Sequence, residues 1–254
     1  MRKVVCLSLL LMFCSCAREP NLLKGEWIDL SHDFSEDTIY WNETDSFKKE
    51  VIHEGRTQGG YYYSAYRFCT AEHGGTHLDA PIHFAEGRQT VSQLPLNRLI
   101  GEGVKIDVSD RARGDYKVSV DDLENWEKAN GKIPDGAIVL IQTGYGRYWG
   151  DRKSYMGMDE FGERHFPGLS REAAQWLVRE RRIGAVGIDT ASIDVGSSKN
   201  FEAHVALMSE NVPAFENVAG LERLPVRGFW VVALPMKIKG GSGAPLRIVA
   251  FLPK

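Results

Sequence analysis

Residues 73–83 read His73-Gly74-Gly75-Thr76-His77-Leu78-Asp79-Ala80-Pro81-Ile82-His83 and hold three of the seven histidines of the chain. A histidine pair at i and i+4 would share one helix face, but the two glycines and the proline disfavour a helix here. In an extended strand, His77 and Asp79 project from the same side. The Gly74-Gly75 turn then brings His73 back toward them, so two imidazoles and a carboxylate converge on one point.

This convergence predicts a metal site. Imidazole and carboxylate ligands without a thiolate suit zinc, manganese or iron. We therefore expect one or two divalent ions, zinc or manganese first, with His73, His77 and Asp79 as ligands and open positions for water. The alternative is a cluster of hydrogen-bonded histidines that serves the core.

A second potential ligand set lies far downstream, in Phe201-Glu202-Ala203-His204 and in Pro213-Ala214-Phe215-Glu216-Asn217. Composition alone favours Glu216 as a surface carboxylate and His204 as a partly buried helix residue.

The composition is that of an ordinary globular protein. The 254 residues are 43% hydrophobic and 26% charged, which excludes disordered, collagenous and coiled-coil chains. The formal net charge is -3, with acidic and basic residues mixed along the chain. Because this pattern offers no basic patch, we expect no nucleic-acid partner.

The N-terminus reads as an export signal. Arg2 and Lys3 precede an apolar stretch that is too short to span a bilayer, and Ser15 stands directly before Cys16. This arrangement resembles a bacterial lipoprotein signal. It predicts a signal peptide at 1–15, lipidation of Cys16, a tether at 16–24 and a lipid-anchored place in the cell envelope, facing the periplasm or in the outer membrane. A plain secretory signal is the alternative.

Cysteine usage agrees with that prediction. Cys6, Cys14 and Cys16 all lie in or directly after the signal, so Cys69 has no partner for an internal disulfide. We expect Cys69 to be a buried strand residue and not a nucleophile.

Residues 25–254 read as one mixed α/β domain with a curved, barrel-like sheet flanked by helices. A helix should begin after Ser170 and end near Gly184, a second should cover 122–128, and a third should surround 204–209. The strands are expected at 27–30, 61–70, 104–108, 137–142, 185–188, 229–234 and 246–251.

The signature H-x-G-T-H-x-D-x-P-x-H-F is met at every position from His73 to Phe84, and with it the chain resembles the metal-dependent cyclase or bacterial kynurenine formamidase family, which includes isatin hydrolases. Further similarity appears at 29–32, 141–144, 166–170 and 187–194. The resemblance implies a swivelling β/β/α fold, homodimers and a small-molecule substrate.

The resemblance also implies roles for individual residues. His73, His77 and Asp79 would bind metal, His204 and Glu216 would complete a two-metal set, and His83 would be the catalytic acid/base. For His204 and Glu216 this reverses the interpretation from composition.

The implied reaction is hydrolysis of a carbon–nitrogen bond in an amide, formamide or lactam by metal-activated water. Trp41, Tyr40 and Phe84 are candidate stacking surfaces for an aromatic substrate. Where relatives often have Trp-Pro or Tyr-Pro, this chain has Trp41-Asn42, so the formamidase substrate does not simply transfer. Two alternatives stay open: a cyclase that uses the same metal site, and a metal-retaining envelope binding protein without turnover.

Overall fold

The structure is a computed structural model that describes residues 24–254. The predicted signal peptide, residues 16–23 of the tether and the lipidation site Cys16 lie outside the described residues. Between residues 24 and 254, no helix combines the length and the apolar character that a membrane crossing needs.

The described part of the chain contains short helices and many strands. The strands are β1 (Gly25–Asp29), β2 (Lys48–Arg56), β3 (Tyr62–Cys69), β4 (His77–Asp79), β5 (Ile100–Asp107), β6 (Lys117–Val118), β7 (Ile138–Gln142), β8 (Gly168–Leu169), β9 (Ala185–Ile188), β10 (Ala214–Glu216), β11 (Phe229–Pro235) and β12 (Gly243–Pro253). The helices are α1 (Leu96–Leu99), α2 (Val120–Asn130), α3 (Arg152–Tyr155), α4 (Arg171–Arg181) and α5 (Glu202–Met208).

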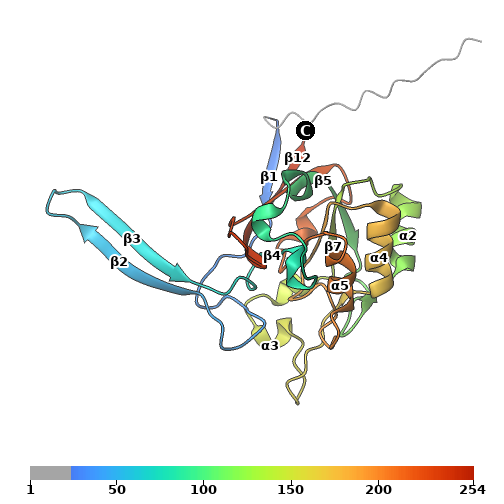
Figure 1. Ribbon diagram of the computed structural model, residues 1–254, viewed down its shortest axis with the longest axis horizontal. Helices are drawn as coiled ribbons and strands as arrows, with labels where there is room; N and C mark the ends of the chain where they lie inside the picture. The colour runs from blue at the N-terminus through green and yellow to red at the C-terminus, as the bar shows by residue number, and fades with distance from the viewer. Residues whose placement is uncertain (1–23) are drawn as a thin grey trace, which may run out of the picture.

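The main sheet closes on itself. Its strand order is β1-β12-β11-β5-β7-β9-β10-β4, and β4 also pairs with β12, which completes a barrel-like ring (Figure 1). The pairs from β5 through β7 and β9 to β10 are parallel, whereas β11, β12 and β4 pair antiparallel to their neighbours. The prediction of a mixed α/β domain with a curved sheet is confirmed.

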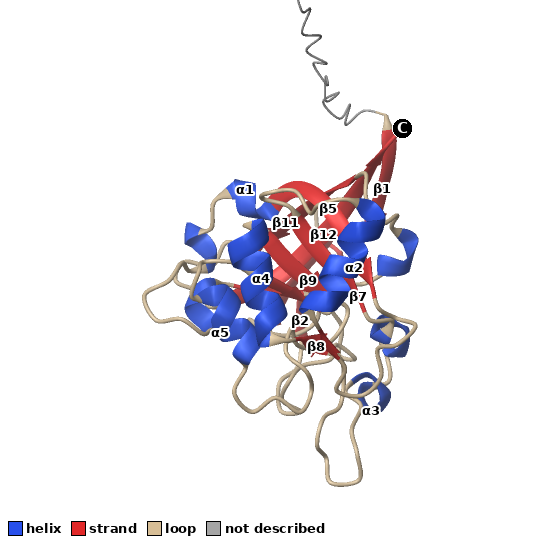
Figure 2. Cartoon of the chain, turned by 90° about the vertical axis from the view of Figure 1, so that its right-hand side faces the viewer, coloured by secondary structure: helices blue, strands red, loops and turns tan. Residues whose placement is uncertain are grey.

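Side chains alternate between the inside of this barrel and its helix-covered outer side. On β7, Leu140 belongs to the cluster inside the barrel, whereas Val139 and Ile141 pack in the cluster that includes α2, α4 and α5. Figure 2 shows these helices against the strands. On the short β4, Leu78 faces inward, so its neighbours His77 and Asp79 face the outer side under α5.

The helix starts follow their capping residues. The Ser170 side chain accepts a hydrogen bond from Ala173 N at 3.1 Å, and Ser119 forms a capping box with Asp122 at the start of α2. All three predicted helices are present as α2, α4 and α5, although α4 ends at Arg181 and α5 at Met208, slightly before the predicted ends.

Strands β2 and β3 form a separate two-stranded hairpin that projects from the barrel (Figure 1). Sequence analysis predicted a strand at 61–70 but not its partner β2, whose sequence is rich in charged residues. The prediction that Cys69 is buried is wrong. Cys69 ends β3 and is exposed, because no second layer covers the ribbon at this position.

Candidate metal centre

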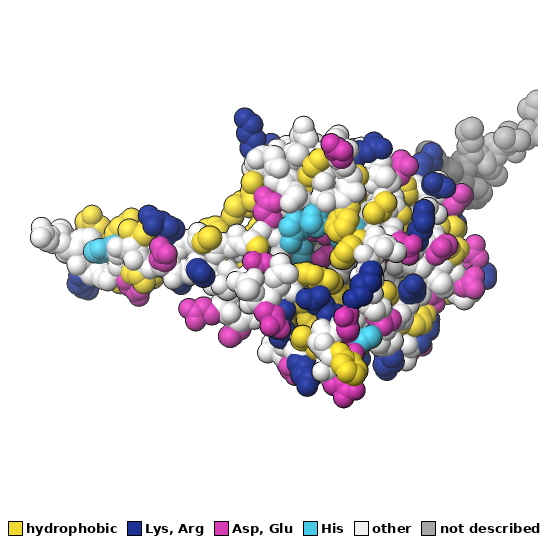
Figure 3. Space-filling model, turned by 60° about the horizontal axis from the view of Figure 1, so that its bottom comes forward, with side chains coloured by type: hydrophobic (Ala, Val, Ile, Leu, Met, Phe, Trp, Pro, Cys, Tyr) yellow, Lys and Arg dark blue, Asp and Glu magenta, His cyan; other side chains and the backbone are white. Residues whose placement is uncertain are grey.

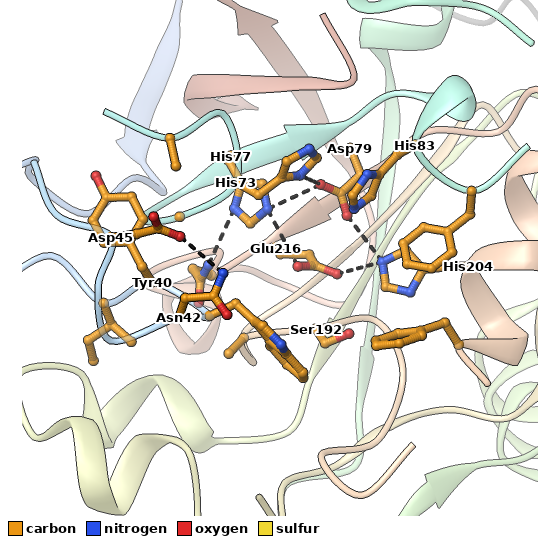
Figure 4. A pocket seen from close by; sticks show the side chains of 18 residues that line it. Tyr40, Asn42, Asp45, His73, His77, Asp79, His83, Ser192, His204 and Glu216 are labelled. Carbon is orange, nitrogen blue, oxygen red and sulfur yellow. Dashed lines mark hydrogen bonds and ion pairs between the residues drawn. The ribbon is translucent and has the colours of Figure 1, made fainter. Parts of the chain in front are cut away.

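The centre starts at the outer face of β4, where His77 and Asp79 emerge side by side (Figure 4). Nε2 of His77 lies 3.1 Å from Oδ1 of Asp79. Strand β10 places Glu216 directly opposite His77 in the antiparallel ladder, and Oε2 of Glu216 lies 3.5 Å from the same Nε2. The strand geometry predicted for His77 and Asp79 is therefore present.

Helix α5 adds His204 from above this face. Its Nε2 is 3.1 Å from Oδ2 of Asp79 and 3.1 Å from Oε1 of Glu216. The surface position that composition favoured for Glu216 is wrong: only 5% of the residue is exposed, because β10 lies inside the sheet with α5 across it.

His73 reaches the cluster through the predicted glycine turn. Gly75 has a φ of +56°, in the left-handed region that glycine adopts without strain. The turn directs Nδ1 of His73 to 2.6 Å from Oδ1 of Asp79. His73, His77, Asp79, His204 and Glu216 thus come together, with Asp79 at the centre (Figure 4).

His83 lies beside the cluster at the end of a short 3-10 helix, Pro81–His83. Its ring stacks on His73, with centroids 3.8 Å apart and planes 18° apart. Phe84 meets His83 edge-on at 4.5 Å. Burial lowers the pKa of His83 to about 4, against the nearby Asp79 carboxylate, which raises it.

The cluster concentrates negative charge in a buried place. Burial, reinforced by the carboxylate of Asp79, raises the pKa of Glu216. Burial would raise the pKa of Asp79 as well, but His77 and His73 hold it well below its usual range. Burial would lower the pKa of His77, yet Asp79 and Glu216 raise it to about 9. No lysine or arginine is among the described residues that line the adjoining cavity.

Two buried carboxylates need a compensating positive charge, which protonated imidazoles or a divalent cation can supply. Imidazole nitrogens and carboxylate oxygens are donors that divalent transition metals accept. Two sets of donor atoms lie close enough to share an ion, one of His73, Asp79 and His83 and one of His77, Asp79 and Glu216. The donor set fits one or two divalent ions.

The two buried histidines are held so that Nε2 faces the centre. Nδ1 of His77 donates to the carbonyl oxygen of Gly75 at 3.0 Å. Nδ1 of His204 donates to Oδ2 of Asp194 at 2.6 Å. These hydrogen bonds keep Nδ1 of each ring occupied and direct Nε2 at the centre, which is the orientation in which a neutral imidazole binds metal.

Two buried aspartates, Asp189 and Asp194, follow β9, and each fixes a turn through hydrogen bonds. Asp189 does so, since its carboxylate accepts from the backbone N–H groups of Thr143 and Gly144. Asp194 does more, because its carboxylate accepts from the backbone of α5 as well as from the His204 ring. Nothing in the local sequence distinguishes these two aspartates.

The cluster forms one end of a cavity of about 320 Å³, near the low end of the range for small-molecule sites. Figure 3 shows histidine side chains gathered in this hollow, close to where the hairpin leaves the body. Aromatic side chains form most of the cavity wall, and the polar side chains of Asn42 and Asp45 line another part of it. The aromatic residues are Tyr40, Trp41, Phe84 and Phe201.

All three predicted stacking residues line the cavity, but their side chains differ in how far they are buried and held by neighbours. Tyr40 is 1% exposed, and its hydroxyl group is hydrogen bonded to Thr70 at 2.5 Å. Trp41 is half-buried and lies under the guanidinium of Arg164 at 4.2 Å. Arg152 and Arg164 also donate to the Trp41 carbonyl oxygen, at 3.1 and 3.0 Å.

No sequence pattern indicates Phe201, Arg152 or Arg164 as a residue of this site. Arginines that hold a carbonyl oxygen more than a hundred residues away have no local sequence signal. The remaining histidines lie elsewhere. His32 stacks on Trp149, His165 pairs with Asp115, and His53 is on the hairpin.

Comparisons with known proteins agree with the geometry. A family described as putative cyclases matches residues 28–195. An isatin hydrolase of Roseibium aggregatum is 32% identical over 193 residues, which are 72% of this chain and 73% of the relative. A kynurenine formamidase of Bacillus cereus is 27% identical over 225 residues, covering 89% and 97%.

Solved structures give the same result. Isatin hydrolase A from Ralstonia solanacearum aligns with a TM-score of 0.83 at 30% identity, covering 89% of this chain and 92% of that chain. A protein described as a potential metal-dependent hydrolase with cyclase activity aligns with a TM-score of 0.71 at 25% identity, covering 90% and 98%.

Proposed function

Because the chain belongs to the cyclase family, we propose that it is a divalent-metal-dependent hydrolase of a carbon–nitrogen bond in an amide, formamide or lactam. The observation that carries the proposal is the convergence of three imidazoles and two carboxylates on one buried point at the end of a small-molecule cavity. The two named relatives act on an isatin and on a formamide, both of which contain such a bond.

We propose His77, Asp79, His204, Glu216 and His73 as the ligands and zinc or manganese as the metal. A bound divalent ion would supply Lewis acidity, which polarises a carbonyl oxygen and lowers the pKa of water. The residues of the chain position the donor atoms around such an ion. His77 and His204 direct their Nε2 atoms at the centre, and the carboxylate of Asp79 contacts both rings.

We assign His83 as the acid/base. Its imidazole lies against the ligand cluster and faces the cavity, so it can take a proton from the attacking water and give it to the leaving nitrogen. The stack on His73 constrains the plane of the His83 ring. Trp41, Phe84 and Phe201 exclude water from one side of the cavity and offer aromatic faces to the substrate.

The test is an assay of purified protein that has been stripped with a chelator and then supplied with Zn²⁺ or Mn²⁺. The substrates are N-formyl aryl amines, isatin-like lactams and cyclic imides, and ring-opened acids are offered to detect cyclisation. Metal-dependent hydrolysis of one class supports the proposal. Ring closure without hydrolysis would favour a cyclase, and metal binding without turnover of any substrate would favour a binding protein.

We also propose export and lipidation at Cys16, which the sequence of residues 1–16 supports. Metabolic labelling of the producing bacterium with an alkyne fatty acid should mark the protein. Cys16→Ala should abolish the label, and Cys14→Ala should keep it. Labelling that is lost only in Cys14→Ala would move the anchor to that residue.

We further propose a homodimer in which the β2–β3 hairpin contacts the second copy. An isolated two-stranded hairpin is marginal in water. Val51, Tyr66 and Phe68 share one face of it by register, and each is at least 40% exposed. Sedimentation of the wild type should give a dimer, and replacing Tyr66 and Phe68 by Ser should give a monomer. A wild type that sediments as a monomer would contradict this proposal.

A further inference from the structure

His73 differs from the other two histidines of the cluster in how its ring is held. Its Nδ1 faces Asp79, whereas its Nε2 lies 3.0 Å from Oγ of Ser242. Ser242 comes from the turn before β12, about 170 residues further along the chain. The ring of His73 is thus fixed between a central carboxylate and a distant hydroxyl group.

The direction of the hydrogen bond to Ser242 follows from its second partner. The Ser242 hydroxyl donates to Oε2 of Glu72 at 2.7 Å, because an ionised carboxylate only accepts. A hydroxyl group has one hydrogen, so Oγ of Ser242 must accept from Nε2–H of His73. Oε2 of Glu72 also accepts from the backbone N–H of Ser242 at 2.9 Å, which fixes the turn against the carboxylate.

This chain of hydrogen bonds selects one tautomer of a neutral His73. With the proton on Nε2, the lone pair of Nδ1 points at Oδ1 of Asp79, only 2.6 Å away. At this distance either a proton on Nδ1, which a protonated His73 donates to Asp79, or a bound cation must lie with the two atoms. His77 and His204 present Nε2 to the cluster instead, since their Nδ1 atoms are already hydrogen bonded.

The backbone of β12 reinforces this placement. Gly243 pairs with Asp79 in the β12–β4 ladder, and a Cβ atom there would lie 2.4 Å from Cε1 of His73. The ring therefore lies directly against the strand, and one of its faces stacks on His83 with the centroids 3.8 Å apart. A shift of His73 would move His83 with it.

We propose that Ser242 and Glu72 are positioning residues of the metal centre, which orient His73 so that it binds the cation through Nδ1 while His77 and His204 bind through Nε2. This assignment rests on the metal site of the proposed function. It adds two residues from outside the histidine signature and its downstream partners.

One test is the affinity for Zn²⁺ alone, measured by competition with a chromogenic chelator. Ser242→Ala should weaken binding by about 10- to 100-fold, and Ser242→Thr, which keeps the hydroxyl group, should restore most of it. Ser31→Ala is the matched control, because the Ser31 hydroxyl also bonds β12, at Ile248, without touching a ligand. It should stay within about twofold of the wild type in the same titration.

A second measurement needs no variant. Long-range ¹H–¹⁵N spectra of histidine-labelled, zinc-loaded protein distinguish nitrogens that carry a proton from those that bind metal. We expect His73 to be zinc-bound at Nδ1 and protonated at Nε2, and His77 and His204 to show the opposite pattern.

Zinc at Nε2 of His73, or a Ser242→Ala affinity within twofold of the wild type, would overturn the positioning role while leaving the metal site intact. A wild-type protein that binds no zinc would instead defeat the proposed function and the positioning role together.

Discussion

Oδ2 of Asp194 lies 2.6 Å from Nδ1 of His204, and the same carboxylate group accepts the backbone N–H groups of Ala203 and His204. One side chain therefore caps the start of α5 and sets the tautomer of the histidine that α5 carries. The position of α5 and the orientation of the His204 ring therefore both depend on Asp194.

This coupling predicts the effect of Asp194→Asn. Asparagine still caps a helix, but it is a weaker acceptor for the imidazole N–H, so metal affinity should fall by about 10- to 100-fold with little loss of helix. Asp189→Asn is the control, because Asp189 is equally buried but its carboxylate bonds only the 143–144 turn and Gly146. Equal affinity in the two variants, by chelator competition, would contradict the prediction.

Asp79→Asn should abolish metal binding and activity together. Asp79 is the one residue that contacts His73, His77 and His204 at once, and the substitution removes a negative charge from a site with no lysine or arginine in its described lining. Metal content by mass spectrometry after dialysis checks this. Wild-type metal occupancy in the variant would exclude a central role for the carboxylate.

His83→Ala should keep the metal and lose rate. A general acid/base accelerates a reaction by about 10²- to 10⁴-fold, so kcat should fall by that factor. The metal content of the variant should equal that of the wild type. Steady-state kinetics on the substrate class found in the screen gives the rate. Turnover unchanged from the wild type would defeat the assignment of His83.

Arg164→Ala should act on substrate binding through Trp41. The guanidinium lies over the indole ring and donates to the Trp41 carbonyl, so its loss frees one wall of the cavity. Because an aromatic contact is worth about 0.5–1.5 kcal/mol, KM should rise by roughly 2- to 13-fold with kcat changed less. A fall in kcat at constant KM would place Arg164 in a different role.

The lowered pKa of His32 predicts that the stability of the fold depends on pH. Burial lowers its pKa to about 4, against an opposing effect of Asp33, whereas the unfolded chain takes up a proton near 6.5. The unfolded state thus binds more protons between these values, so stability is full above pH 6.5 and falls as the pH drops toward 4.

His32→Phe keeps an aromatic ring on Trp149 and removes this titration. Melting temperatures of the metal-free wild type and variant should diverge in favour of the variant as the pH falls from 7 to about 4.5. Parallel curves would show that His32 carries no such dependence.

The first part of the centre was predictable because it lies within one window of sequence. Alternation along a strand places His77 and Asp79 on one side, and two glycines allow the turn that returns His73. Local chemistry and local geometry agree there, so residue types and their spacing suffice.

The second part was accessible only through family resemblance. Strand β10 has three residues and α5 has seven, too few for a periodic pattern that would show which way Glu216 and His204 face. Their burial is decided by the closure of the sheet, which brings β10 beside β4 and lays α5 across both.

The hairpin and Ser242 were not predicted for a related reason. The charged β2 becomes a strand only by pairing with β3. Ser242 lies in a glycine-rich turn whose sequence resembles any loop. It reaches His73 only because the β12–β4 ladder places this turn beside the histidine signature.

The most direct measurement is an anomalous difference map from crystals of the protein grown with Zn²⁺ or Mn²⁺, collected at the absorption edge of the metal. One or two peaks are expected among His77, Asp79, His204 and Glu216, with His73 at their edge. A map with no peak among these side chains, at metal concentrations that saturate the protein in solution, would contradict this expectation.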